Sequence, residues 1–272
     1  MGIYDFEAAK KQHHPIEICH ALPSELGRDE TKWVAIMNPL KKLAKNMPFI
    51  STAHRKLLQH TRSAEKVFTD IYKGNTWGGE ASVSGIGSDT HQTEFIAQQL
   101  PMLFREYEIT TLLDIPCGDF HWMKDVDRSG IDYLGADIVT DLVQKNNQLY
   151  ASERVRFQRL NLTRDKLPKT DLVFCRDCLV HLPNADVLTA LKNICASESS
   201  YLLTTTFSRD AKNVDIAAGQ WRVLNLELPP FGLPQPLALI VEGCTVDGNA
   251  YRDKALGLWT ISDIRRALRL AA

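Results

Sequence analysis

Short apolar segments that alternate with helix-like stretches constrain the fold of this sequence more than any other feature. Helices are predicted around residue 123 and over 142–149 and 186–195. Five segments around them are predicted as strands: residues 111–115, 133–137, 155–160, 172–175 and 201–207. Strands this apolar are buried on both faces, which is typical of a parallel sheet covered by helices. The pattern therefore predicts an α/β fold with a Rossmann-like, doubly wound, mostly parallel sheet.

Two further apolar segments follow near the end of the sequence. Residues 237–241 and 255–260 are predicted as strands of a terminal hairpin, which brings the sheet to seven strands. The stretch before them, residues 226–234, contains several prolines and cannot form a regular helix. It is predicted as a loop on the substrate side of the sheet.

The chain before the first strand divides into two parts. Residues 1–63 mix short apolar pieces with prolines and a basic stretch, and are predicted as a helical N-terminal extension that serves as a lid, a docking segment or a dimerisation segment. Residues 64–272 are predicted as the main domain, with a first helix that ends near Gly74. Asp89 followed by Gln92 predicts the capping box of a longer second helix. A chain of 272 residues is long enough for one α/β domain with such an extension.

Charge and cysteine content argue against several classes of protein. The formal net charge is −1, so no global field attracts nucleic acid, and no nucleic-acid partner is expected. The six cysteines are scattered along the chain, which argues against a disulfide framework. No apolar run approaches the ~18 residues that a transmembrane helix needs. These observations predict a cytoplasmic protein, with a homodimer as one possible assembly.

Acidic residues follow the first two predicted strands. The first strand leads into Asp114-Ile-Pro-Cys-Gly-Asp, and the second ends about 20 residues later at Asp137. Ligands of open parallel sheets bind outside the carboxyl ends of the strands, near the point where the strand order reverses. An acid at the end of the second strand is positioned to accept hydrogen bonds from both ribose hydroxyls of a nucleoside. The sequence therefore predicts a nucleoside-containing cofactor.

The loop after the first strand discriminates between two such cofactors. A pyrophosphate needs a GxGxxG loop that bares backbone N–H groups. Here Gly118 is flanked by the acids Asp114 and Asp119, which would repel a pyrophosphate. The same acids would favour the ammonium and sulfonium groups of S-adenosylmethionine. This chemistry favours S-adenosylmethionine over a nicotinamide dinucleotide and disfavours an oxidoreductase.

At these residues the sequence resembles the class I S-adenosylmethionine-dependent methyltransferases. The resemblance covers roughly residues 84–260 and rests on the loop that begins at Asp114, on Asp137, and on the segment 171–182. The glycine-rich motif of the family usually has glycine where this chain has Pro116 and Phe120.

The resemblance implies a set of cofactor contacts. Asp114 and Gly118 would line the methionine part of the cofactor, Asp137 would hold the ribose, and Asn161 and Leu162 would border the adenine. The complete set lies at the ends of the first four strands and comprises Asp114, Pro116, Gly118, Asp119, Asp137, Ile138, Asn161, Leu162 and Cys175.

Candidate catalytic residues follow the fourth strand, whose end faces the transferred methyl group in this family. Asp177 and His181 are four residues apart, so both share one face if the turn after the strand is helical. They would then act as a base and the group that orients it, or share a divalent metal, although the sequence does not indicate a metal site. His121 directly follows the cofactor loop and is a third candidate.

Aromatic, hydroxyl and arginine side chains are expected to surround the opening of the same site. Such groups suit a saccharide or another polyol, through stacking and hydrogen bonds. The candidates for acceptor binding are Trp77, Ser84, Ser88, Arg176, Trp221 and Arg222. The predicted partner is a small-molecule or glycan acceptor, methylated on oxygen. Two alternatives stay open: N-methylation of a small amine or a protein side chain, and a non-catalytic scaffold that keeps the methyltransferase fold.

Overall fold

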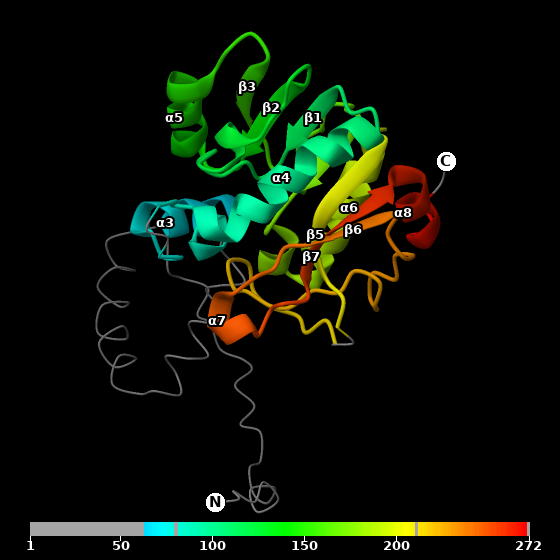
Figure 1. Cartoon of the computed structure of the whole chain (residues 1–272). Helices are drawn as coiled ribbons and strands as arrows, with labels where there is room; N and C mark the ends of the chain where they lie inside the picture. The colour runs from blue at the N-terminus through cyan, green and yellow to red at the C-terminus, as the bar shows by residue number, and fades with distance from the viewer. Residues whose placement is uncertain (1–62, 79–80, 210–211, 271–272) are drawn as a thin grey trace, which may run out of the picture. The chain divides into compact units, whose positions relative to one another are not determined.

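A single mixed sheet organises the part of the chain that the structure describes. The computed structural model describes residues 63–78, 81–209 and 212–270, so the predicted extension over residues 1–63 lies outside the described residues apart from Ser63. The strand order is β3-β2-β1-β4-β5-β7-β6 (Figure 1). The strands are β1 (Thr111–Asp114), β2 (Asp132–Asp137), β3 (Val155–Arg159), β4 (Leu172–Cys175), β5 (Tyr201–Phe207), β6 (Ala238–Val241) and β7 (Lys254–Thr260).

The first five strands run parallel, and β7 runs antiparallel to both β5 and β6. This arrangement confirms the predicted α/β class, the mostly parallel sheet and the terminal hairpin. Each predicted strand agrees with the observed one to within one residue at either end. The central strands β1, β4 and β5 are largely buried apolar runs, which marks them in the sequence, whereas the edge strands β3 and β6 are partly exposed.

Helices cover both faces of the sheet. One apolar core joins the sheet to α4 (Thr90–Glu106) and α5 (Thr140–Tyr150), and a second core on the other face joins it to α6 (Asn184–Ala196) and α8 (Ile261–Ala267). The remaining helical elements are α3 (Ala64–Gly74) and the shorter η1 (Ile86–Ser88), η2 (Met123–Asp125), η3 (Leu179–His181) and α7 (Val246–Asn249). Successive residues of β1 alternate between the two cores, with Leu112 in one and Leu113 in the other.

The start of α4 differs from the predicted capping box. Asp89 is the N-cap residue, but its side chain makes no capping hydrogen bond. Gln92 instead turns toward the hairpin, where its Nε2 donates to Thr245 Oγ1 at 2.7 Å and its Oε1 accepts from the Thr245 N–H at 3.3 Å. The prediction of the helix start was correct and that of the capping box was wrong, because the Gln92 amide is satisfied by a tertiary contact.

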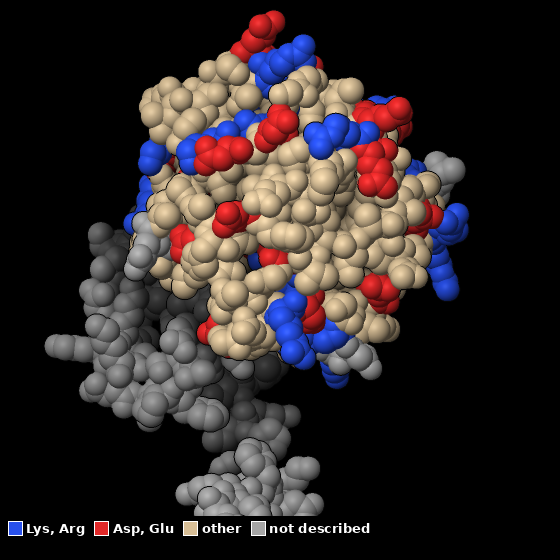
Figure 2. All heavy atoms as spheres, in the orientation of Figure 1, with Lys and Arg blue, Asp and Glu red and all other residues tan. Residues whose placement is uncertain are grey.

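The surface carries charges of both signs. On the face shown in Figure 2, Lys and Arg side chains lie interspersed with Asp and Glu. Exposed charges also form pairs on the described surface, such as Arg154 with Asp132 at 3.1 Å. Among the described residues, no helix has both the length and the apolar character that crossing a membrane requires.

Candidate active site

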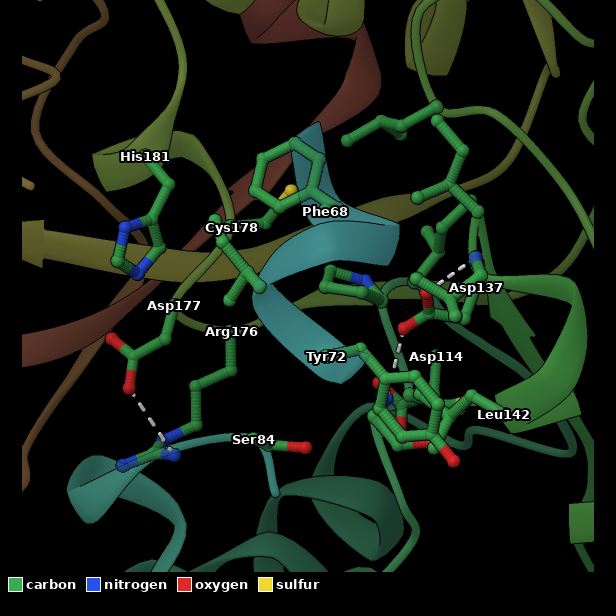
Figure 3. A pocket seen from close by; sticks show the side chains of 18 of the residues that line it. Phe68, Tyr72, Ser84, Asp114, Asp137, Leu142, Arg176, Asp177, Cys178 and His181 are labelled. Carbon is green, nitrogen blue, oxygen red and sulfur yellow. Dashed lines mark hydrogen bonds and ion pairs between the residues drawn. The ribbon is translucent and has the colours of Figure 1, made fainter. Parts of the chain in front are cut away.

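A cavity lies at the carboxyl ends of β1, β2 and β4, where the strand order reverses between β1 and β4. Helix α3 covers part of it, and Phe68 and Tyr72 project from α3 toward the cavity (Figure 3). This is the position at which open parallel sheets bind their ligands. The predicted site residues that line the cavity are Trp77, Ser84, Ser88, Asp114, Pro116, Gly118, Asp119, Asp137, Ile138, Asn161, Leu162, Arg176, Asp177 and His181.

Four predicted site residues do not line this cavity. The ring of His121 faces Thr90, with 3.5 Å between Nε2 and Oγ1. Cys175 is fully buried at the end of β4, and Trp221 packs edge-on against Tyr251. The guanidinium of Arg222 is buried and donates to the Leu182 carbonyl at 2.7 Å. The four residues outside the lining are His121, Cys175, Trp221 and Arg222.

The loop after β1 leaves no room for a side chain at Gly118. Its φ is +56°, and a Cβ atom there would lie 2.2 Å from Ser84 Oγ. The Gly118 N–H donates to Asp137 Oδ2 at 3.3 Å, which joins this loop to the end of β2. Glycine is therefore required here both by the backbone conformation and by the close approach of Ser84.

Two buried carboxyl groups face the cavity. Burial raises the pKa of Asp114 to about 7, against a hydrogen bond from Tyr133 that lowers it. Burial likewise raises the pKa of Asp137 to about 6, although backbone N–H groups such as that of Val139 at 2.9 Å stabilise its charge. Each group lacks enough positive charge around it to offset its lost hydration. A cationic ligand beside them would supply that charge.

Asp119 and Asn161 line the cavity but are engaged with the chain itself. The carboxylate of Asp119 accepts from the Ser82 hydroxyl at 2.9 Å and from the Val83 N–H at 3.0 Å, and so it fixes the loop before α4. The side-chain oxygen of Asn161 accepts from the Thr163 N–H at 2.9 Å. In Asn161 this leaves the amide N–H groups as the part of the side chain suited to a ligand.

Three buried charges and the half-buried Asp177 form a cluster at the cavity, which we call the charge cluster: Arg176, Asp177, Glu242 and Lys254. Arg176 Nη2 lies 2.7 Å from Glu242 Oε2, and Lys254 Nζ lies 2.6 Å from Asp177 Oδ2. Two cross-pairs complete it, Arg176 with Asp177 at 3.3 Å and Lys254 with Glu242 at 3.2 Å. The two cations and two anions compensate each other. Of the four, Arg176 and Asp177 line the cavity.

The charge cluster determines the protonation state of Asp177. Burial raises the pKa of this carboxyl group, but Lys254 and Arg176 outweigh burial and hold the pKa well below its usual range. Asp177 also has a left-handed backbone (φ 52°), and the helical turn begins only at Leu179. The helical geometry that would place Asp177 and His181 on one helix face is therefore absent, although both line the cavity.

His181 is held from two sides. Its Nδ1 lies 2.9 Å from the Gln220 carbonyl oxygen, so Nδ1 carries the proton and donates it. Its ring stacks on Trp77 at 4.5 Å between centroids and 27° between planes. Burial lowers the pKa of the imidazole, and the nearby Asp177 carboxylate partly restores it. The result is a neutral imidazole whose Nε2 keeps its lone pair.

Several residues of the site were missed by sequence reasoning. Phe68 and Tyr72 come from α3, which was predicted as a helix but not as a cover of the cavity. Glu242 and Lys254 lie at the ends of the two hairpin strands. Single charges that bound apolar strands are a usable signal of a buried ion pair, but their partners could not be identified without the topology. In the described part of the chain, no group of three or more His, Cys, Asp or Glu side chains is arranged to hold a metal ion.

Comparisons with known proteins agree with this geometry. A family model described as a methyltransferase domain matches residues 88–237, more than half of the chain. No curated protein matches the sequence. Among solved structures, human N-acetylserotonin methyltransferase in complex with S-adenosylmethionine is similar with a TM-score of 0.50 and 16% identity, over 72% of this chain and 59% of the human one.

A second similar structure is magnesium protoporphyrin IX methyltransferase from Synechocystis PCC 6803 with bound S-adenosylmethionine. It has a TM-score of 0.42 and 16% identity, over 57% of this chain and 81% of its own. At 16% identity the human structure shows the fold alone, and the family model shows the family. The chain belongs to the methyltransferase domain family and has the fold of the class I S-adenosylmethionine-dependent methyltransferases.

Proposed function

We propose that the protein transfers the methyl group of S-adenosylmethionine to a hydroxyl oxygen of a small polar acceptor. The observation that carries this proposal is the state of His181, a neutral imidazole that lines the cavity with Nδ1–H bonded to the Gln220 carbonyl. An alcohol must lose its proton as its oxygen is methylated, so O-methylation needs a base of this kind. An amine that is already neutral needs no base before it attacks.

The residues present fit S-adenosylmethionine. Asp114 and Asp137 are buried carboxyl groups with raised pKa values, which a cationic ligand would stabilise in their charged form. Asp114 would face the methionine part, Asp137 the ribose, and Asn161 with Leu162 the adenine. When bound, the cofactor supplies a methyl group on a positively charged sulfur, ready for in-line displacement.

His181 and Asp177 would have different roles in the transfer. Nε2 of His181 would take the proton that the acceptor hydroxyl loses when the cofactor supplies its methyl group and leaves as S-adenosylhomocysteine. Asp177 cannot act as that base, because Lys254 and Arg176 hold its pKa well below the usual range of a carboxyl group. Its negative charge favours the imidazolium that forms on His181.

An uncharged acceptor fits this end of the cavity. Arg176 and Asp177, the charged residues of the lining near His181, are both paired within the charge cluster. Hydroxyl and aromatic groups from Ser84, Ser88 and Trp77 line the same cavity. We propose a saccharide or similar hydroxyl compound as the first acceptor class to test.

The test has two stages, both with the full chain. Titration calorimetry with S-adenosylmethionine should show binding that is lost in Asp114→Ala and Asp137→Ala, because each substitution removes a charge or a ribose acceptor. Release of S-adenosylhomocysteine is then measured with matched pairs of acceptors, such as a sugar and the corresponding amino sugar. Turnover of the hydroxyl compounds supports the proposal.

Three results would contradict the proposed function. Turnover confined to the amines would favour the N-methyltransferase alternative. Tight cofactor binding with no product from either series would favour a scaffold that keeps the fold. An unmutated chain that does not bind S-adenosylmethionine would overturn the assignment of the cofactor site itself.

A further inference from the structure

Tyr133 lies next to Asp114 without being part of the cavity lining. It sits on β2 and is almost fully buried, at 1% exposure. Its hydroxyl donates to Asp114 Oδ2 at 2.6 Å, a short hydrogen bond to a carboxyl group. Among the described residues this is the side-chain hydrogen bond that Asp114 accepts, so Tyr133 is its principal support.

The sheet makes room for this contact. In the pairing of β1 with β2, Leu112 lies opposite Tyr133 and Asp114 lies opposite Gly135. The tyrosine ring therefore extends along the sheet past Gly135 to reach the carboxyl group. A Cβ atom on Gly135 would lie 2.6 Å from Phe157 Cδ1 and 3.0 Å from Tyr133 Cε1, so the missing side chain leaves room for both rings.

The guanidinium group of Arg128 lies over the rings of Tyr133 and Phe120. Its guanidinium carbon is 5.2 Å from the centroid of the Tyr133 ring and 5.0 Å from that of Phe120. The guanidinium is fixed by hydrogen bonds to the Met123 and Val126 carbonyl oxygens. A cation over a phenol ring draws electron density from it and makes the hydroxyl a better donor. Arg128 also places a positive charge near Asp114.

We propose that Tyr133 and Arg128 are positioning residues that fix the Asp114 carboxyl group and keep it anionic for the cofactor. This inference rests on the proposed function, since it concerns the same cofactor site. Tyr133 acts through its hydroxyl and Arg128 through the ring it covers. Neither residue lines the cavity, so neither is expected to contact the cofactor.

The groups around Asp114 determine how its charge responds to pH. Burial raises its pKa, the Tyr133 hydrogen bond and the cations Arg128 and Arg176 lower it, and the Asp137 carboxylate raises it. The buried Tyr133 keeps its own proton, because its pKa lies well above the usual value. Loss of the Tyr133 hydroxyl therefore raises the pKa of Asp114 further, and fewer molecules carry the anion near neutral pH.

The experiment compares S-adenosylmethionine affinity in the unmutated chain and in Tyr133→Phe between pH 6 and pH 9. The ratio of the two affinities is used, because the amino group of the ligand titrates equally in both series. If the pKa of Asp114 rises by about one unit, the ratio is about tenfold at pH 6, about fivefold at pH 7 and close to one at pH 9. The control is Tyr150→Phe, because the Tyr150 ring packs on the same Phe120.

The outcomes separate the inference from the proposed function. A ratio that is constant across the pH range, or equal to one throughout, overturns the inference and leaves the cofactor assignment standing. An unmutated chain without affinity for S-adenosylmethionine overturns both. Arg128→Gln serves as a second variant if Tyr133→Phe fails to fold, and it should give a ratio that changes with pH in the same direction.

Discussion

His181 and Asp177 line the same cavity, but their surroundings give them opposite capacities for proton transfer. Burial keeps His181 neutral, and the Gln220 carbonyl holds the proton on Nδ1. Asp177 is paired with Lys254 and Arg176, which hold the pKa of its carboxyl group well below the usual range and favour the ionised form. The neutral imidazole is therefore the group that can accept a proton, and the carboxylate is the group that stabilises the resulting charge.

Replacement of His181 should affect the reaction far more than binding. For His181→Gln we expect the rate of methyl transfer to fall by about 100-fold or more, since general base catalysis contributes that much. Affinity for S-adenosylmethionine should stay within a few-fold. The measurement is S-adenosylhomocysteine release with an accepted hydroxyl compound, alongside calorimetry.

The matched control is His121→Gln, because His121 lies outside the cavity lining. In the unmutated chain the rate should rise with pH up to the lowered pKa of His181 and then level off, because only the neutral imidazole accepts a proton. Equal activity of His181→Gln and His121→Gln would remove His181 from the mechanism.

At the scale of secondary structure, the sheet was predictable and the tertiary contacts of polar side chains were not. The central strands β1, β4 and β5 are largely buried, and a strand buried on both faces leaves a clear apolar pattern in the sequence. The Gln92 amide pairs with Thr245, far along the chain, and so the capping box does not form. Helix α8 was missed because it begins directly after β7, where Thr260 ends the strand and caps the helix.

A residue's place in the cavity could be predicted from the sequence where that residue follows a strand. Asp114, Gly118 and Asp137 follow strands whose carboxyl ends meet at one edge, and they line the cavity as expected. Trp221 and Arg222 lie in an irregular segment, whose path depends on many weak contacts. Residues of that kind cannot be located from the local pattern of the sequence.

The charge cluster links the hairpin of β6 and β7 to the segment that follows β4. This link should contribute measurably to the free energy of unfolding. Glu242→Gln keeps the shape of the side chain but leaves Arg176 and Lys254 with Asp177 as their sole anionic partner in the cluster. We expect the free energy of unfolding to fall by about 3–5 kcal/mol, as when one partner of a buried ion pair is removed. Denaturant unfolding at neutral pH is the measurement.

A surface ion pair provides the comparison for this variant. Asp132→Asn breaks the exposed pair with Arg154 and should change the free energy of unfolding by less than about 1 kcal/mol. A similar small loss in Glu242→Gln would mean that the charge cluster contributes little to the attachment of the hairpin.

For the molecule as a whole, the ionised carboxyl groups of the cavity lower the free energy of unfolding when no ligand is bound. The pKa of Asp114 is about 7 in the folded chain, above the ordinary value of about 3.9 in an unfolded one. Folding therefore favours the protonated form of Asp114. The contribution of this group to the free energy of unfolding is fully present below pH 4 and is lost as the pH rises through 7. The free protein should be less stable at pH 8 than at pH 5 on account of this group.

Asp114→Asn tests this relation between function and stability. The amide does not ionise, so at pH 8 the ligand-free variant should be more stable than the unmutated chain, by about 1–3 kcal/mol. At pH 4 the two chains should be nearly equal. Denaturant unfolding at both pH values is the measurement, and calorimetry should show that the more stable variant has lost cofactor affinity. A variant that is less stable at pH 8 would contradict the argument.

The charged residues at the cavity depend on two parts of the chain that are synthesised at different times, and the later part is the antiparallel hairpin. Asp114 and Asp137 are in the chain well before residue 200, whereas Arg176 and Asp177 pair with Glu242 and Lys254 of the hairpin, respectively. Substitutions in those last strands would thus reach the cavity indirectly, through Arg176 and Asp177, the two members of the charge cluster that line it.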